Sequence, residues 1–307
     1  MRRQLTRPGF SLVEIIVALA IGGLVAAAAT GVLRRQQRFF ARAATLVEQR
    51  VSLRDATAIL PGELRALAPA SGDIVAFSDS SLEIRATIGT AIACDTIAGG
   101  TAIVLAPGDL TAGALTAYAT APQTGDVALV FDDGGSDIAA DDRWVVIDVA
   151  SAVSDSERCG PSPFVSDEHV PGTPGRAPGF LVRFAGDVRL PATVRPGAFV
   201  RIVRRVRYRF YRGSTSDWFL GYAEWAGSGY GVVQPVSGPF APYRARGGGV
   251  SLRYFDRDGS EITPGTESSR VARIEVAARG IARAALSGAK IAALTDSQRV
   301  AVRMRNP

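Results

Sequence analysis

The sequence predicts an α+β protein in which a long N-terminal helix carries an antiparallel, β-rich globular head. Three observations lead to this fold class. Residues 15–33 contain no charged side chain, and residues 34–60 contain neither proline nor glycine while apolar side chains recur at helical spacing. After Pro69, short β-branched runs alternate with Gly, Asp and Pro. With 307 residues, 47% of them hydrophobic, the chain can bury a substantial core.

The uncharged run 15–33 is long enough to cross a bilayer, because as a helix it spans about 29 Å. Arginines flank it on both sides, so the charge bias alone does not set its orientation. A secretory signal peptide cleaved at Ala26-Ala27-Ala28 and an ordinary single-span anchor are two interpretations. Glu14 inside the apolar segment and a helical pattern that continues past the alanines count against the signal peptide.

The segment Gly9-Phe10-Ser11-Leu12-Val13-Glu14 supports a third interpretation, since it resembles the prepilin signature of the type IV pilin-like superfamily. The resemblance implies that the prepilin peptidase cleaves between Gly9 and Phe10 and N-methylates Phe10. It also implies that Glu14 meets the N-terminal amine of a neighbouring subunit, so that two charges in an apolar environment neutralise each other. A glutamate that snorkels to the membrane interface is the simpler alternative.

This resemblance gives a domain plan: a leader at 1–9, a transmembrane segment at 10–33, an amphipathic stalk at 34–61 and a head at 62–307. We expect Pro61-Gly62 to end the helix, and a short second helix to follow around Glu63–Leu67. The Pro/Gly-rich segment 160–179 marks the expected division of the head into two lobes. The apolar stripe of the stalk that is expected to pack on the head consists of Phe40, Ala44, Val47, Val51 and Ile59.

Rows of small residues at four-residue spacing run along the apolar helix. Such rows let helices pack closely in lipid, although alanine enrichment from coding bias explains them equally well. The rows are Ala18, Gly22, Ala26 and Thr30, and Gly23, Ala27 and Gly31.

Strands are expected in the head wherever β-branched or aromatic residues alternate with polar ones. The expected strands are Asp73–Phe77, Leu82–Ile88, Ala102–Leu105, Val127–Phe131, Trp144–Val149, Phe180–Phe184, Val200–Tyr211, Trp218–Trp225, Val250–Phe255, Arg270–Ala277 and Arg299–Arg303. The order of the last ones, with a D-x-D-G hairpin and a closing V-x-M-R-N, is similar to the W-type minor pilins and the J-type minor pseudopilins of type II secretion. That similarity covers roughly residues 198–307.

The expected function is therefore structural: a minor pilin or pseudopilin that primes assembly or forms the tip of a type IV pilus or a type II secretion pseudopilus. Its expected partners are the prepilin peptidase, other pilins through the N-terminal helix, and membrane lipid before assembly. We expect a single-pass inner-membrane protein with a cytoplasmic N-terminus and a periplasmic head, later part of the filament. A pilus-borne adhesin or DNA-uptake receptor is the alternative. A membrane-anchored hydrolase is disfavoured, and no enzyme activity or cofactor is expected, because the single His169 and the absence of known nucleophile motifs leave no catalytic set.

Three further groups of residues have two interpretations each. Asp256, Asp258 and Glu261 resemble half of a calcium loop, but their spacing favours a hairpin turn and no metal. The acidic cluster Asp132, Asp133, Asp137, Asp141 and Asp142 is either a Ca²⁺ site or a polar loop. Cys94 and Cys159 form a disulfide if the head is exported, and are otherwise buried free thiols.

Charge is unevenly distributed behind the net +6. Residues 62–170 hold four Arg against seventeen acids, and residues 171–307 hold 22 Lys and Arg against nine acids. Either the two blocks neutralise each other within one head, or they dock acid to base between subunits. The arginines of Val200–Tyr211 suggest nucleic acid as an alternative partner, but their alternation favours a solvated strand face over an apolar core.

Overall fold

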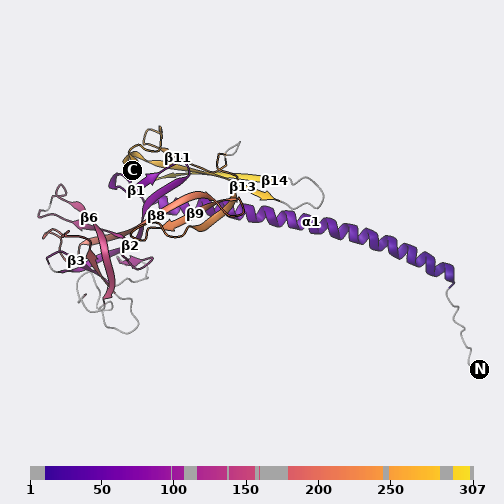
Figure 1. Cartoon of the computed structure of the whole chain (residues 1–307), viewed down its shortest axis with the longest axis horizontal. Coiled ribbons are helices and arrows are strands. Elements are labelled where there is room, and N and C mark those ends of the chain that lie inside the picture. Colours follow the sequence, from indigo (N-terminus) through magenta and orange to yellow (C-terminus); the bar gives the residue numbers. More distant parts are fainter. Residues whose placement is uncertain are drawn as a thin grey trace, which may run out of the picture. The chain divides into compact units, whose positions relative to one another are not determined.

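The computed structural model describes residues 11–97, 99–106, 116–136, 138–155, 159, 179–244, 249–283 and 293–304. The chain divides into two compact units, residues 1–51 with 281–296 and residues 52–280 with 297–307. A single helix, α1 (Leu12–Arg65), runs through the end of the first unit into the second. A largely antiparallel sheet makes up most of the second unit (Figure 1), and the predicted α+β class is confirmed.

Helix α1 has 54 residues and is about 80 Å long. The predicted stop at Pro61-Gly62 is wrong, because Pro61 lies inside the helix, which ends at Arg65. Proline removes one helical hydrogen bond. The buried Leu60, Leu64 and Leu67 offset that loss by continuing the apolar contact with the sheet across the proline. Residues 63–65 of the predicted separate helix are therefore the last turn of α1, and Leu67 lies just beyond it.

The apolar stripe by which α1 packs in the second unit also differs from the prediction. Ile59 is 41% exposed, whereas Leu53, Ala56 and Leu60 are buried. These residues follow the same i, i+3, i+4, i+7 spacing as the predicted stripe but lie on another helix face. Phe40, which began the predicted stripe, is 67% exposed in the first unit.

The strands of the sheet overlap every run that the sequence predicted. They are β1 (Ile74–Phe77), β2 (Ser81–Ile97), β3 (Ala102–Leu105), β4 (Ala117–Tyr118), β5 (Val127–Asp132), β6 (Arg143–Asp155), β7 (Gly179–Phe184), β8 (Phe199–Arg212), β9 (Trp218–Glu224), β10 (Gln234–Phe240), β11 (Ser251–Phe255), β12 (Glu261–Ile262), β13 (Arg273–Arg283) and β14 (Ala293–Arg303). The sequence did not predict β4, β10 and β12. Two are only two residues long, and β10 contains Pro235 and Pro239, which disguise a strand pattern.

One part of the second unit, here called the helix-packed lobe, is built around the end of α1. Strands β1, β2, β8, β9 and β10 are neighbours in the sheet, and β13, β11 and β12 continue it. Its core joins Leu60 and Leu64 of the helix to Ile84, Tyr208 and other inward side chains of the sheet. Burial of this helix face against the sheet holds the lobe together.

The other part, here called the barrel lobe, is a closed ring of six strands within the described residues. Antiparallel pairs link β2 to β3, β3 to β7, β7 to β6, β6 to β5, β5 to β8, and β8 back to β2. A second core fills the ring with Ile103, Val130, Ile147, Val182 and Ile202, among others. Because the ring is closed, these strands leave no free sheet edge.

The barrel lobe is an insertion into the helix-packed lobe. Strands β2 and β8 pair along their length, from Ser81↔Arg209 to Ile92↔Phe199, so they are hairpin partners joined by a very long connection. The two lobes share these strands (Figure 1), and a register shift between Thr87 and Gly89 marks where β2 passes from one core to the other. The head thus divides along β2 and β8. The segment 160–179, where we expected the division, lies outside the described residues except for Gly179.

A buried ion pair lies at the junction between the two cores. On the core face of β8, Ile202 belongs to the barrel core and Val206 to the helix-packed core, with Arg204 between them. The Arg204 guanidinium donates to both carboxylate oxygens of Asp126, at 2.7 and 2.9 Å, and to Glu224 at 3.1 Å. The side chains of Arg204 and Asp126 are 5% and 1% exposed. In the sequence of Val200–Tyr211, Arg204 is the arginine at a position where the alternation would place an apolar residue.

Candidate functional site

The start of α1 is closed by reciprocal hydrogen bonds between Ser11 and Glu14. The Ser11 amide donates to Glu14 Oε2 at 3.0 Å, and the Glu14 amide donates to Ser11 Oγ at 3.3 Å. This is a capping box, in which the N-cap serine and the acid three residues on satisfy each other's free amides. It holds the Glu14 carboxylate against the first turn of the helix, four residues after Phe10 in the sequence. We did not infer this from the sequence, although the S-x-x-E pattern indicates it.

The following apolar segment presents exposed side chains on all sides. Leu12, Leu19 and Leu24 are all more than 70% exposed, and α1 is long and apolar enough to cross a membrane by length and composition. A side chain added at Gly22, Gly23 or Gly31 would meet no atom within 4 Å. The small-residue rows are therefore open along the helix surface, where another helix could approach the backbone closely.

Gly9 and Phe10, the residues predicted at the cleavage and methylation site, lie outside the described residues. The sequence around them matches the family model of the prokaryotic N-terminal methylation motif over residues 6–30. This match includes Gly9, Phe10, Glu14 and all but the last three residues of the uncharged run 15–33. The chain is type IV pilin-like. Searches among curated proteins and among solved structures found no match to it.

The head of this pilin-like protein contains the disulfide pair expected from the sequence. Cys94 on β2 and Cys159 are joined, with their Cα atoms 5.3 Å apart and a sequence separation of 65. Cys159 is 1% exposed and lies in a small apolar cluster with Val104 and Leu181. In the chain-entropy model a bridge over this separation stabilises the fold by about 4 kcal/mol.

The residues considered for a weak metal site form a hairpin turn. Asp256 Oδ1 accepts hydrogen bonds from the amides of Asp258 and Ser260, and Gly259 takes a positive φ of 84°. The Glu261 carboxylate forms a two-point hydrogen bond with Arg253, which lowers the pKa of Glu261. These carboxylates therefore serve the turn between β11 and β12.

The acidic cluster begins at Asp132, the last residue of β5, and continues through the loop to β6, with Asp137 outside the described residues. Asp132 is 1% exposed and pairs with Arg143 at 3.0 Å. Asp141 accepts three hydrogen bonds from Gly135 and Ser136, and the Ser136 hydroxyl is the main cause of its lowered pKa. Two of the acids thus organise the loop. Loss of hydration, together with the nearby Asp133, raises the pKa of Asp142.

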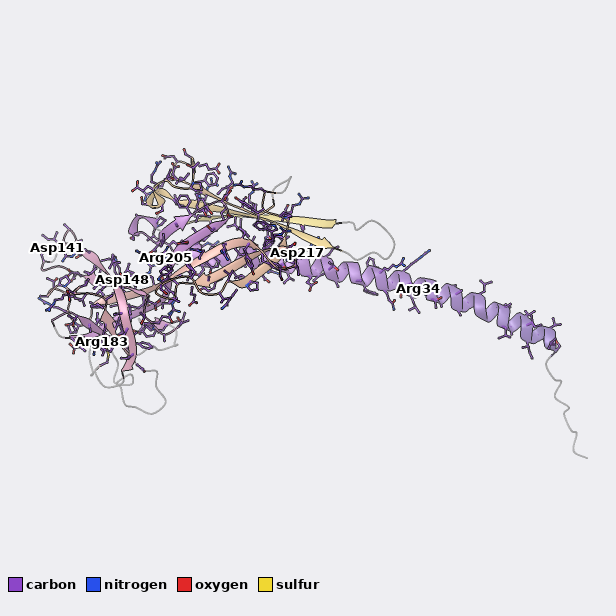
Figure 2. All side chains as sticks on the ribbon, viewed as in Figure 1. Arg34, Asp141, Asp148, Arg183, Arg205 and Asp217 are labelled. Carbon is purple, nitrogen blue, oxygen red and sulfur yellow. A yellow bond between two sulfur atoms is a disulfide. The ribbon has the colours of Figure 1, made fainter. Side chains whose placement is uncertain are left out.

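The arginines of β8 are engaged with neighbouring side chains of the head, in the part of Figure 2 where Arg205 is labelled. Glu83 on β2 accepts from Arg205 and Arg207, both at 2.6 Å. The Arg207 guanidinium also lies 3.7 Å from the ring centre of Tyr230. Because carboxylate and aromatic partners already occupy these cations, the face has the character of a solvated sheet surface more than of a nucleic-acid interface.

The acidic and basic blocks of the sequence meet inside a single head. Each of the following pairs joins an acid of 62–170 to an arginine of 171–307. They are Asp73–Arg201, Asp79–Arg244, Glu83–Arg205, Glu83–Arg207 and Asp126–Arg204. Two of the five pairs join Glu83 on β2 to β8, and the acids of two others, Asp73 and Asp79, flank β1. These contacts favour mutual neutralisation within one chain over acid-to-base docking between subunits.

Proposed function

We propose that this chain is a minor pilin or pseudopilin that primes assembly or forms the tip of a type IV pilus or a type II secretion pseudopilus. The observation that carries the proposal is the prepilin signature with Glu14 in the first turn of a 54-residue helix. The prepilin peptidase would cleave between Gly9 and Phe10 and methylate the new N-terminus. Glu14 would then meet the amine of a neighbouring pilin.

The inserted barrel lobe supports a minor over a major subunit. A helical filament repeats one contact surface at every step, so each copy must present the same compact outline to its neighbours. A lobe enclosed by β3, β5, β6 and β7 adds bulk that such a repeat would have to accommodate at every position. A subunit used once, at the tip, carries no such restriction.

The disulfide supports the proposed location. Cys94 and Cys159 pair in the structure, and such bonds persist in oxidising compartments. We therefore assign the head to the periplasm and then to the filament, with the N-terminus cytoplasmic and residues 10–33 in the inner membrane.

The variant Glu14→Ala tests the assembly role. We expect it to be inserted in the membrane and cleaved normally, and to be absent from sheared filaments, because the amine of its neighbour loses its counter-charge. Immunoblots of membrane and filament fractions measure both properties. Two controls separate the steps: Gly9→Asp should keep its leader and migrate more slowly, and Glu48→Ala, an exposed glutamate of the same helix, should assemble normally. Normal incorporation of Glu14→Ala would contradict the proposal.

A further inference from the structure

Three aromatic residues lie side by side across the barrel lobe. Phe131 on β5 is directly paired with Trp144 on β6. The ladder between β5 and β8 ends at Val130↔Val200, so Phe131 and Phe199 occupy the next positions. Because Val130 and Val200 point into the barrel core, the neighbouring Phe131 and Phe199 point outward.

The three rings pack edge to face and remain partly accessible. The Trp144 ring centre lies 5.4 Å from that of Phe131 and 6.1 Å from that of Phe199. Trp144 is 43% exposed, and Val146, two residues along β6, is 49% exposed. Exposure of aromatic rings to water is unfavourable in free energy, so a ligand that covers them gains from their burial. On a rigid strand surface such rings form a flat apolar platform.

A pocket of about 500 Å³ adjoins this platform. Phe131 and Phe199 line it, and its walls are the loop 133–136 after β5 and the loop 193–198 before β8. The pocket therefore combines aromatic side chains with the polar groups of two loops, which is the composition expected of a small-molecule site.

Both walls are held in place without a ligand. In the first loop, at the end of the lobe where Figure 2 labels Asp141, that carboxylate accepts from the Gly135 and Ser136 amides. In the second loop, the Gly197 amide donates to Ala93 O at 2.8 Å, and the Ala93 amide donates to Ala198 O at 2.9 Å. Preformed walls reduce the conformational entropy that a ligand must offset on binding.

The polar groups that line the pocket balance in charge. Asp133 and Arg195 supply one negative and one positive charge, and both side chains are exposed. Ser136 and Thr193 contribute hydroxyl groups, which both donate and accept hydrogen bonds. Among the residues that line the pocket, neither sign of charge is therefore in excess. Such a lining suits an uncharged ligand with many hydroxyl groups and one apolar face.

We propose that the barrel lobe binds a neutral saccharide in this pocket, with the C–H face of a sugar ring against Phe131 and its hydroxyls hydrogen-bonded to Asp133 and Thr193. The proposal goes beyond the assembly function and rests on the barrel lobe alone. A failure of Glu14→Ala to behave as expected would leave it unaffected.

The test is NMR of the full-length protein in dodecylphosphocholine, a detergent without a sugar headgroup. The probes are glucose, galactose, N-acetylglucosamine, maltose and lactose. We expect saturation transfer from the aromatic protons to at least one sugar and a chemical-shift change of the Trp144 indole, which the variant Trp144→Phe assigns. Asp133→Asn should weaken binding about tenfold, since a hydrogen bond to a carboxylate is lost. Phe131→Leu, which keeps apolar volume, should weaken it several-fold.

The control is Asp187→Asn, which removes an exposed carboxylate outside the pocket lining and should bind as the unsubstituted protein does. The proposal is overturned if none of the five sugars gives saturation transfer at millimolar concentration. It is equally overturned if binding is unchanged in both Asp133→Asn and Phe131→Leu while their amide spectra show a folded barrel lobe.

Discussion

Arg204 shows how one residue can keep two cores distinct. It occupies a core-facing position of β8 between Ile202 and Val206, where an apolar side chain would fuse the barrel core with the helix-packed core. Its charge needs the carboxylate of Asp126, and Asp126 belongs to the inserted lobe. The pair therefore ties the insertion to the strand that it shares with the rest of the head.

Asp126→Asn should destabilise the head strongly, because it leaves the Arg204 charge buried with only Glu224 as a counter-ion. Removing one partner of a buried pair typically costs about 3–5 kcal/mol. Urea unfolding followed by circular dichroism measures the change. Asp148→Asn, at an exposed position of β6 in the same lobe, is the control and should change stability by less than about 1 kcal/mol. A loss of that small size in Asp126→Asn would show that the pair contributes little.

The sequence predicted residue roles well where it leaves no choice of partner, and poorly where a side chain could pair with many others far along the chain. The pairing of Cys94 with Cys159 was expected because only two cysteines exist, so no choice of partner was needed. The phase break at Arg204 was visible, but its partner Asp126 lies 78 residues away, and no local pattern connects them. The row of Trp144, Phe131 and Phe199 depends on the register of three strands, which periodicity alone does not set.

At the scale of elements, the long helix and most strands were predictable, but the arrangement of the strands was not. Alternation of apolar and polar residues predicts a strand but not which strands pair with it. The closed ring, which includes the pairing of β2 with β8, could therefore not be predicted from the sequence. The end of α1 was misjudged because Pro61 outweighed Leu64 and Leu67 in the local pattern, whereas packing against the sheet decides it in the fold.

Removing the insertion should leave a folded helix-packed lobe. Thr87 and Val203 face each other in the β2–β8 register, so replacing residues 88–202 by Asn-Gly would join them as a two-residue hairpin. We expect this shortened chain to melt cooperatively and to retain a dispersed amide spectrum. The deletion also removes Asp126, but Arg204 then lies two residues from the new turn, where water can hydrate its charge in place of that carboxylate.

A matched deletion tests where the boundary lies. Replacing only residues 93–198 leaves Ile88, Val200 and Ile202 of the barrel core without their partners, so that variant should aggregate. If the larger deletion also aggregates while the full-length chain does not, the two lobes fold as one unit and the insertion is not separable.

At the scale of the whole molecule, acidic and basic side chains pair within one chain, so the stability of the head should depend on pH in the acidic range. Burial by itself raises the pKa of Glu83, but the hydrogen bonds from Arg205 and Arg207 outweigh it and hold the pKa below its ordinary value. A carboxylate whose pKa is lowered by folding stabilises the protein above its unfolded pKa, and this contribution is lost as pH falls through the folded value.

We therefore expect the Tm of the head to fall as pH drops from about 5 to below about 4, the range in which glutamates protonate. Differential scanning calorimetry at a series of pH values measures it. Glu83→Gln should lower Tm at neutral pH and show a smaller decline in acid, because it has no proton to gain there. An equal acid decline in Glu83→Gln and the unsubstituted protein would assign the effect to other carboxylates.

The shared strands also determine how the head responds to a pull. Both chain connections of the insertion, through β2 and β8, leave the helix-packed lobe at the same end of one ladder. A load applied to the barrel therefore draws the two strands in the same direction, and no sliding between them results. Instead it shears β2 against β1 and β8 against β9, so that many hydrogen bonds resist together before any one breaks. Such a joint transmits tension along the strands instead of peeling open.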